Sequence, residues 1–259
     1  MQLYMKTKIP KLPMIIFKPF IVSLLFFLIS LFLFVSSQFP IHRKTTAHSA
    51  TIRLSNSSSS SSSLRIRHDY SSYNSYINHQ LNKTLNPKLR KIWTTRDWDR
   101  KVRIFFGFFE SLKRRRLLSN DSKVLSIGAR VGHEVAALKL VGVEDSVGID
   151  LVPRPPQVME GDFHAQPFDE ETFDFEFSNV FDHALYPWKF VGEIQRTLKP
   201  GGVCVLHVAL LRRADKYLAN DLYSVEPLAE LFNGSDLLQV NKVDGFGLDT
   251  EVVFRKKIK

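Results

Sequence analysis

Two glycines and one aspartate have the residue types and spacing of a site for a nucleotide-like ligand. Gly128 follows the apolar run 124–127, and Gly132 stands where a segment with helical spacing begins. Glycine lets a ligand approach the backbone closely, and a helix N-terminus offers free N–H groups. Asp150 ends the next apolar run, about 20 residues after Gly128, where a carboxylate can bind ribose hydroxyls. By itself this pattern fits a nicotinamide-dependent enzyme as well as other nucleoside-binding enzymes.

Asp182 and His183 are the candidate catalytic pair. Both lie in the segment FDHALYP, just after the alternating run 173–177. Histidine exchanges protons near neutral pH, so His183 with Asp182 beside it is a candidate general base. The alternative interpretation is a loop histidine that only caps or packs. His207 lies in a later apolar run and is expected to be a buried, structural residue.

The cysteine content limits the other chemistry that is available. Cys204 is the one cysteine, which excludes a disulfide within the chain and a cysteine zinc site. It lies in the apolar run 203–211, so we expect a small buried side chain and no nucleophile. No metal site is predicted.

From Lys123 onward the chain alternates between strand-like and helix-like segments. The runs that predict strands are 124–127, 146–149, 158–160, 173–177, 203–211, 237–243 and 250–255. Helical spacing is found at 135–140, 187–198 and 225–232. This order predicts an α/β, Rossmann-like, doubly wound sheet with a closing hairpin, which binds its ligand at the carboxyl ends of the strands.

The first 120 residues divide by composition into four segments ahead of a domain at 121–259. Residues 1–18 are a short basic tail, and 19–37 contain the uncharged run FIVSLLFFLISLFLFV. A helix over 20–37 would be roughly 27 Å long, enough for a thin bilayer, so we expect a transmembrane signal-anchor helix. A cleaved signal peptide is the alternative. Residues 38–86, with the run SNSSSSSSS, are expected to be a disordered stalk, and 87–120 to be an amphipathic helical extension.

Charges and glycosylation sequons indicate an orientation for this anchor. Basic residues are slightly more numerous before the apolar run than directly after it, which favours a cytosolic N-terminus. Four sequons lie beyond the run, at Asn56, Asn82, Asn120 and Asn233. We therefore expect a single-pass protein of the endoplasmic reticulum or Golgi membrane with its domain in the lumen.

Four segments resemble the class I, S-adenosylmethionine-dependent methyltransferases, in particular the small type 11 members. VLSIGARVGHE at 124–134 resembles the first motif of this family, and VGIDL at 147–151 resembles its ribose-binding strand end. GDFHAQPFDEETFDFEFSN at 161–179 and EIQRTLKPGGVCVL at 193–206 are the most specific matches. The resemblance implies a seven-stranded sheet and S-adenosyl-L-methionine as cofactor.

The resemblance also implies roles for individual residues. Gly128 and Gly132 would lie against the methionine part of the cofactor, Asp150 and Leu151 at the ribose, and Asp162 and Phe163 at the adenine. Ser178 and Asn179 would border the place of methyl transfer. The expected cofactor-binding residues are thus Gly128, Arg130, Gly132, Asp150, Leu151, Asp162, Phe163, Ser178 and Asn179.

Two positions depart from the family motif. Ser126 stands where the family has an acid, and Arg130 stands where it has a glycine. Arg130 could instead bind the methionine carboxylate, and Glu134 the amino group. Because of these departures, the second hypothesis is a non-catalytic member of the fold that serves as a binding or scaffold module.

The methyl acceptor is expected to be a small molecule or a glycan. The segment 212–224 carries Arg212, Arg213, Lys216, Tyr217 and Tyr223, and in related enzymes this region covers the substrate. The net charge of +10 comes largely from the part of the chain before Asp121, while acids outnumber bases from there to Asp249. With an anchor and an acidic catalytic segment, a nucleic-acid partner is not expected.

Overall fold

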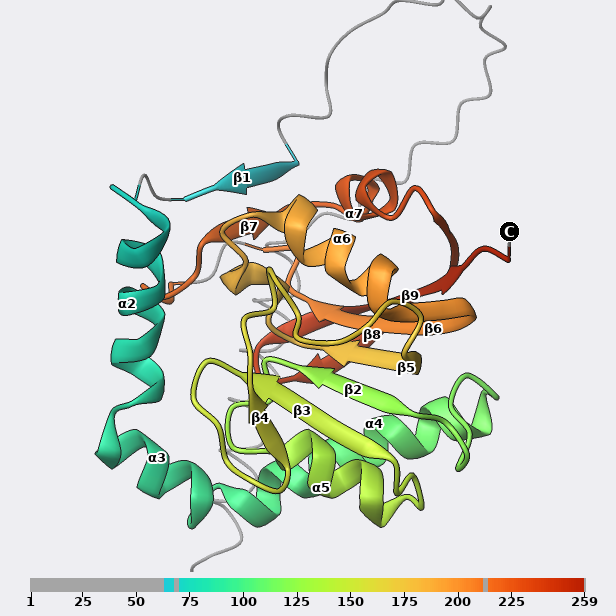
Figure 1. Cartoon of the computed structure of the whole chain (residues 1–259), viewed down its shortest axis with the longest axis horizontal. Helices are drawn as coiled ribbons and strands as arrows, with labels where there is room; N and C mark the ends of the chain where they lie inside the picture. Colours follow the sequence, from blue (N-terminus) through green and yellow to red (C-terminus); the bar gives the residue numbers. More distant parts are fainter. Residues whose placement is uncertain (1–62, 68–69, 212–213, 259) are drawn as a thin grey trace, which may run out of the picture. The chain divides into compact units, whose positions relative to one another are not determined.

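The structure, a computed structural model, describes residues 63–67, 70–211 and 214–258. Seven strands form the central sheet, in the order β4-β3-β2-β5-β6-β9-β8 (Figure 1). They are β2 (Val124–Ile127), β3 (Ser146–Asp150), β4 (Val158–Glu160), β5 (Phe173–Ser178), β6 (Leu198–Val208), β8 (Ser235–Gly245) and β9 (Leu248–Lys256). The first five are parallel to one another, and β9 pairs antiparallel with both β6 and β8. The predicted doubly wound α/β sheet with a closing hairpin is therefore confirmed.

The strand order reverses between β2 and β5. The chain runs outward from β2 through β3 to β4 and then returns to place β5 on the other side of β2. In the register of this pair Ile127 is the partner of Ser178, so the loops that follow the two strands leave the sheet side by side. A ligand of an open α/β sheet binds in the crevice at such a reversal.

Helices cover both faces of the sheet (Figure 1). On one face α6 (Pro187–Thr197) and α7 (Glu226–Leu231) bury Phe190, Ile194 and Leu228 against the strands. On the other face α4 (Trp98–Arg114) and α5 (His133–Leu140) pack Phe105, Phe109 and other apolar side chains against Phe175 and Phe177. The two apolar clusters cover both faces of the sheet.

The predicted helical extension, residues 87–120, contains two helices, α3 (Pro87–Thr94) and α4. Asn86 caps α3 by accepting hydrogen bonds from the backbone of Lys88 and Leu89 at 3.0 and 3.2 Å. In α4, Asp99 stands in the first turn and Lys113 in the last, a distribution that suits the helix dipole. Helical spacing had indicated one or two helices in this region.

The stalk prediction is wrong for residues 64–66 and 73–84. They form strand β1 (Leu64–Ile66), which pairs with β7 (Asn220–Leu222), and helix α2 (Tyr73–Thr84). Tyrosines hold α2 in place: Tyr76 is buried with Leu185 and Ala219, and Tyr70 and Tyr73 pack on the same cluster. The aromatic rings recur at helical spacing in a segment that is otherwise polar, so its composition alone resembled a disordered chain.

Strand β6 begins earlier than expected, at Leu198, and includes the Pro200–Gly202 turn that ends α6. Gly201 has φ of 77°, and a Cβ at Gly202 would lie 2.8 Å from the carbonyl oxygen of Lys199. Within the described ranges no helix is long and apolar enough to cross a bilayer. The predicted anchor at 19–37 and the Ser-rich run lie outside the described residues.

Candidate functional site

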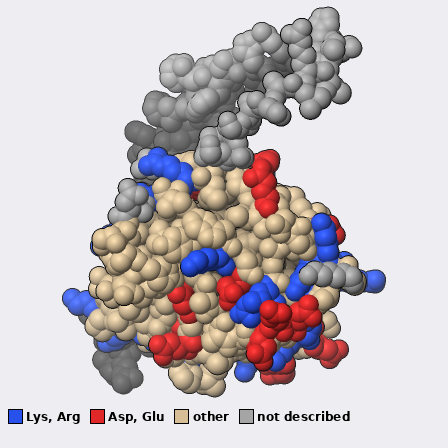
Figure 2. Space-filling view, turned by 45° about the horizontal axis from the view of Figure 1, so that its top comes forward, with Lys and Arg blue, Asp and Glu red and all other residues tan. Residues whose placement is uncertain are grey.

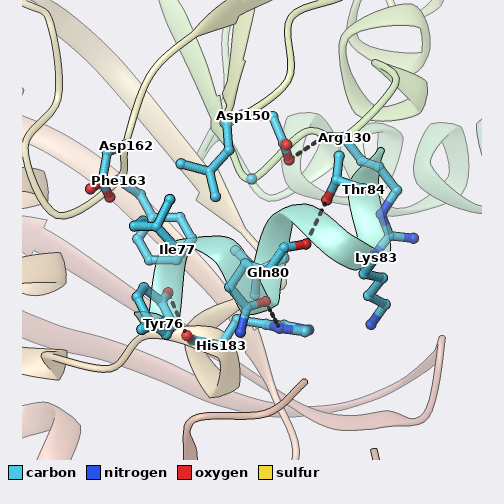
Figure 3. A pocket seen from close by; sticks show the side chains of 13 residues that line it. Tyr76, Ile77, Gln80, Lys83, Thr84, Arg130, Asp150, Asp162, Phe163 and His183 are labelled. Carbon is cyan, nitrogen blue, oxygen red and sulfur yellow. Dashed lines mark hydrogen bonds between the residues drawn. The ribbon is translucent and has the colours of Figure 1, made fainter. Parts of the chain in front are cut away.

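Two adjoining cavities lie at the carboxyl ends of β2 and β5. The smaller cavity, about 50 Å³, is bounded by helix α2 on one side and by the loops after β2 and β3 on the other (Figure 3). The larger cavity, about 440 Å³, extends from these loops to α3, α4 and the β8–β9 turn. Five residues line both, namely Lys83, Gly128, Arg130, Val180 and His183. Two ligands could therefore meet at this junction.

The two predicted glycines have different structural roles. Gly128 has φ of +74°, and a Cβ there would lie 2.4 Å from Cγ2 of Val180, so the loops after β2 and β5 touch through it. Gly132 has φ of +87° at the N-cap of α5, and a Cβ there would lie 2.8 Å from Cβ of Gln157. Gly128 lines both cavities, whereas Gly132 packs behind them and lines neither.

Asp150 stands at the end of β3 and lines the smaller cavity with Leu151. Its carboxylate accepts hydrogen bonds from the backbone N–H of Arg130 at 3.0 Å and of Val152 at 3.3 Å. Burial raises the pKa of Asp150, although Arg130 and these two bonds act in the opposite direction. The carboxylate is thus held at the place where ribose hydroxyls were expected.

Asp162 and Phe163 form the far end of the smaller cavity. The Asp162 carboxylate accepts hydrogen bonds from the Tyr73 hydroxyl and from the backbone of His164. Burial acts to raise the pKa of Asp162, but the hydrogen bonds from His164 and Tyr73 prevail and lower it. Phe163 packs edge-on against Phe190 of the core, with ring centroids 5.3 Å apart.

The predicted residues after β5 separate into one buried and three cavity residues. Ser178 is fully buried, and its hydroxyl donates to the carbonyl of Ile127 at 3.2 Å, so it joins β5 to β2 and does not line a cavity. Asn179 and Asp182 line the larger cavity. His183, at the end of the short 3-10 helix η2 (Phe181–His183), lines both.

The hydrogen bonds of His183 determine which of its ring nitrogens carries the proton. Nδ1 lies 3.1 Å from the backbone carbonyl oxygen of Tyr217 and 3.1 Å from Oε1 of Gln80. Gln80 donates its own amide N–H to the same carbonyl at 2.7 Å, which assigns its oxygen to His183. Because both partners are acceptors, Nδ1 carries the proton and Nε2 keeps a lone pair. Burial lowers the pKa of His183 to about 4, so the ring is neutral at pH 7.

Arg130 occupies its glycine position in a left-handed conformation, with φ of 53°. Its guanidinium lies 4.6 Å from the ring centroid of Trp93 on α3. Ser126 is buried under the site, and its hydroxyl has no hydrogen-bond partner among the described residues. Where the motif has an acid, this chain thus has a buried serine that lines neither cavity. Where the motif has a glycine, it has an arginine at the wall of both cavities.

Glu134 is a buried carboxyl group that also lines the larger cavity. Burial raises its pKa to about 7, and its Oε2 has no hydrogen-bond partner in the described part of the chain. Between about pH 4.5 and 7 the folded state therefore holds a proton that the unfolded state has lost. Stability must fall as the pH rises through this window.

We expect Glu134→Gln to remove this pH dependence. The variant cannot ionise, so its free energy of unfolding should exceed that of the wild type by about 3 kcal/mol at pH 8 and by little at pH 4.5. Urea unfolding of the full chain across this range would measure the difference. Glu144→Gln, at an exposed position, is the control. Parallel curves for wild type and Glu134→Gln would contradict the assignment.

Helix α2 supplies site residues that the sequence analysis missed. Tyr76, Ile77, Gln80, Lys83 and Thr84 all line the smaller cavity. The helical spacing of Tyr70, Tyr73 and Tyr76 was the available signal, but no pattern linked this segment to residues a hundred positions later. Trp93 and Lys101, from the helical extension, were missed in the same way.

The segment 214–224 contributes less to the cavities than expected. Only Asp215 of this segment lines either of them. The Tyr217 ring packs against His79 of α2, with centroids 4.9 Å apart, and Tyr223 lines a separate cavity. Arg212 and Arg213 lie outside the described residues.

Comparisons with known proteins agree with this fold. Residues 125–206 match the family model described as "Methyltransferase domain". Over 143 residues, 51% of this chain and 50% of the relative, the chain is 27% identical to malonyl-acyl-carrier-protein O-methyltransferase 1 of Coxiella burnetii. Over 95 residues, 32% of this chain and 35% of the relative, it is 32% identical to an uncharacterized methyltransferase of Mycobacterium leprae. The chain thus spans half or less of the length of these curated relatives.

A solved structure has the same fold over most of the described part. It is the 1,6-didemethyltoxoflavin-N1-methyltransferase of Burkholderia thailandensis, whose crystal structure holds S-adenosylhomocysteine. The TM-score is 0.56 at 17% identity, covering 74% of this chain and 94% of that one. The chain therefore contains a segment, residues 125–206, that matches a methyltransferase-domain model, and this segment lies within an α/β fold that a solved methyltransferase shares.

Proposed function

We propose that the chain is an S-adenosylmethionine-dependent methyltransferase that acts on a small acceptor. The observation that carries this proposal is the junction of the two cavities at the reversal of strand order, with Asp150 on one side and neutral His183 between them. Gly128, which lines both cavities with its backbone, and the Asp150 carboxylate fit an adenosyl cofactor, since they offer close approach and an acceptor for hydroxyls. When bound, this cofactor supplies an activated methyl group on a sulfonium sulfur.

The residues that line the two cavities would bind the cofactor, orient the acceptor and accept its proton. Asp150 would hold the ribose, Phe163 and Asp162 the adenine, and Arg130 the carboxylate of the amino-acid end. In the larger cavity Asn179 and Asp182 would orient the acceptor. His183 Nε2 would take the proton of an acceptor hydroxyl, which is possible at neutral pH because the ring is uncharged and its Nδ1–H is already bonded.

Direct binding tests this proposal. The full chain should bind S-adenosylmethionine and S-adenosylhomocysteine in calorimetric titrations, and NAD⁺ should not displace them. If a chain that melts cooperatively binds neither at millimolar concentration, the proposal is overturned. That result would favour the alternative of a non-catalytic binding or scaffold module.

Arg130→Ala should weaken the binding of S-adenosylhomocysteine by about 1.5–3 kcal/mol, because a charge-assisted hydrogen bond to the ligand carboxylate is lost. 5′-Methylthioadenosine lacks the amino-acid end, so its affinity should be the same for the variant and the wild type. Calorimetric titration of both ligands measures the two effects, with Arg103→Ala at an exposed position as control. An equal loss for both ligands, or no loss, would contradict the role of Arg130.

We also propose that residues 19–37 tether the domain to the endoplasmic reticulum or Golgi membrane, with the domain in the lumen. The uncharged run supports this, and Asn82, Asn120 and Asn233 of the sequons are exposed and accessible to glycosylation. The proposal includes no nucleic-acid partner. On the face drawn in Figure 2, basic and acidic side chains are interspersed, whereas a nucleic-acid site would be lined mainly by basic ones. Resistance to carbonate extraction and a mobility shift on deglycosylation are the expected results, and release by carbonate would contradict the tether.

A further inference from the structure

Lys101 of α4 is a buried cation at the wall of the larger cavity. It is 8% exposed, and within the described ranges its Nζ makes no hydrogen bond and has no carboxylate within 4.0 Å. The contact that is seen is with Trp93, whose ring centroid lies 5.9 Å from Nζ. Burial, followed by the repulsion of Arg130, lowers the pKa of Lys101 to about 8, so the side chain is still mostly charged at pH 7. A buried charge without a counter-ion is costly, and a ligand that supplies the counter-ion gains affinity.

Asp97 and Glu134 attract Lys101 electrostatically, but within the described ranges neither forms an ion pair with its Nζ, and burial and Arg130 outweigh them. Asp97 lies 3.3 Å from Arg96 and 4.0 Å from Arg100, and Asp215 lies 2.9 Å from Lys83. Asp182 also has interactions of its own. Glu134 is half neutral at pH 7, because burial raises its pKa to about 7. Among the described residues, Lys101 in the larger cavity is therefore left without a direct ion-pair partner.

Apolar side chains surround this charge. Trp93 and Phe105 line the cavity from α3 and α4, and Phe246 lines it from the turn between β8 and β9. The rings of Phe105 and Phe246 lie 4.8 Å apart. Such a wall accommodates an aromatic or aliphatic body next to the charged group of a ligand.

The geometry points to an acceptor with an anionic group, bound by Lys101 in the larger cavity beside the Trp93, Phe105 and Phe246 wall. This inference rests on the proposed function and adds the substrate class. The anion could come from the acceptor or from the carboxylate of the cofactor. Arg130 lines both cavities and is close to the cofactor side, whereas Lys101 lines only the larger one, which assigns Lys101 to the acceptor.

Benzoate and benzyl alcohol test the inference, because they share a ring and differ in charge. We expect the full chain to bind benzoate at least about tenfold more tightly than benzyl alcohol in equilibrium dialysis, by the strength of a charge-assisted contact. Lys101→Met should lose this preference, and Lys91→Met, at an exposed position of α3, should keep it. Since a buried charge is removed, Lys101→Met should melt no lower than the wild type, which shows that it folds.

Titration of S-adenosylhomocysteine into the same variants separates the two sources of the anion. Lys101→Met should bind it within threefold of the wild type. A loss of more than tenfold would assign Lys101 to the cofactor carboxylate and overturn the inference. The inference is also overturned if the wild type shows no preference for benzoate, or if Lys101→Met keeps that preference. The dialysis is also run without S-adenosylhomocysteine, so that the two proposals can fail separately. Failure to bind S-adenosylhomocysteine refutes the proposed function, while the benzoate result alone decides the inference about Lys101.

Discussion

Asp150→Ala is expected to reduce the affinity for S-adenosylhomocysteine by roughly 100-fold or more. The carboxylate is held at the end of β3 by two backbone N–H groups, and its remaining acceptor sites face the smaller cavity. Loss of two charge-assisted hydrogen bonds to ribose hydroxyls costs about 1.5–3 kcal/mol each. Calorimetric titration of the full chain would measure the change.

Two further variants make the Asp150 result specific. Asp150→Asn keeps one acceptor oxygen and should show an intermediate loss. Asp145→Ala removes an exposed acid just before β3 and should bind as the wild type does. If Asp150→Ala melts cooperatively and binds within threefold of the wild type, the ribose is not at Asp150 and the orientation of the cofactor must be revised.

Tyr76→Ala should detach helix α2 from the site. Tyr76 is 1% exposed, and its hydroxyl donates to the backbone carbonyl of His183 at 2.9 Å. Removal of a buried aromatic side chain costs about 3–5 kcal/mol, and here the loss falls on the contact between α2 and the domain. Because α2 forms one wall of the smaller cavity, S-adenosylhomocysteine should bind at least roughly tenfold more weakly, in proportion to the docked fraction.

Hydrogen exchange distinguishes detachment of α2 from general unfolding. In Tyr76→Ala the amides of 73–84 should exchange much faster, while those of β2, β5 and β6 keep the protection of the wild type. Tyr76→Phe retains the ring and should lose only about 1 kcal/mol, and Asn78→Ala, exposed on the same helix, should change nothing. Unchanged exchange of α2 in Tyr76→Ala would show that the helix is held by other contacts.

Helix α2 also connects the stability of the fold to the proposed chemistry. Gln80 and Tyr76 of this helix both bond to His183, which lies 103 and 107 residues later in the chain. Detachment of α2 would therefore open the wall of the smaller cavity and remove Gln80, one of the two acceptors that hold His183 Nδ1. Docking of α2 would thus complete the wall of the cofactor site and orient His183, the candidate base, in one step.

Local patterns in the sequence predicted the sheet, the helices that cover it and the loops at its carboxyl edge. An α/β domain shows apolar residues at a period of two in its strands and of 3.6 in its helices, because each strand and helix must bury a face. Gly128, Asp150, Asp162 and His183 stand at or shortly after the carboxyl ends of strands, so their meeting at one edge follows from a parallel sheet alone. The substitutions Ser126 and Arg130 were equally visible in the motif.

Tertiary structure alone decided how the site is closed. It brought α2 and Trp93 to the cavities, placed Gly132 and Ser178 behind them, and left Lys101 buried beside an apolar wall. These outcomes depend on contacts between segments distant in sequence, such as Tyr73 with Asp162, for which the chain carries no local signal. Residues 64–66 and 73–84 are the clearest case, since β1 is held by its pairing with β7 and α2 by tyrosines that pack on residues 185 and 219.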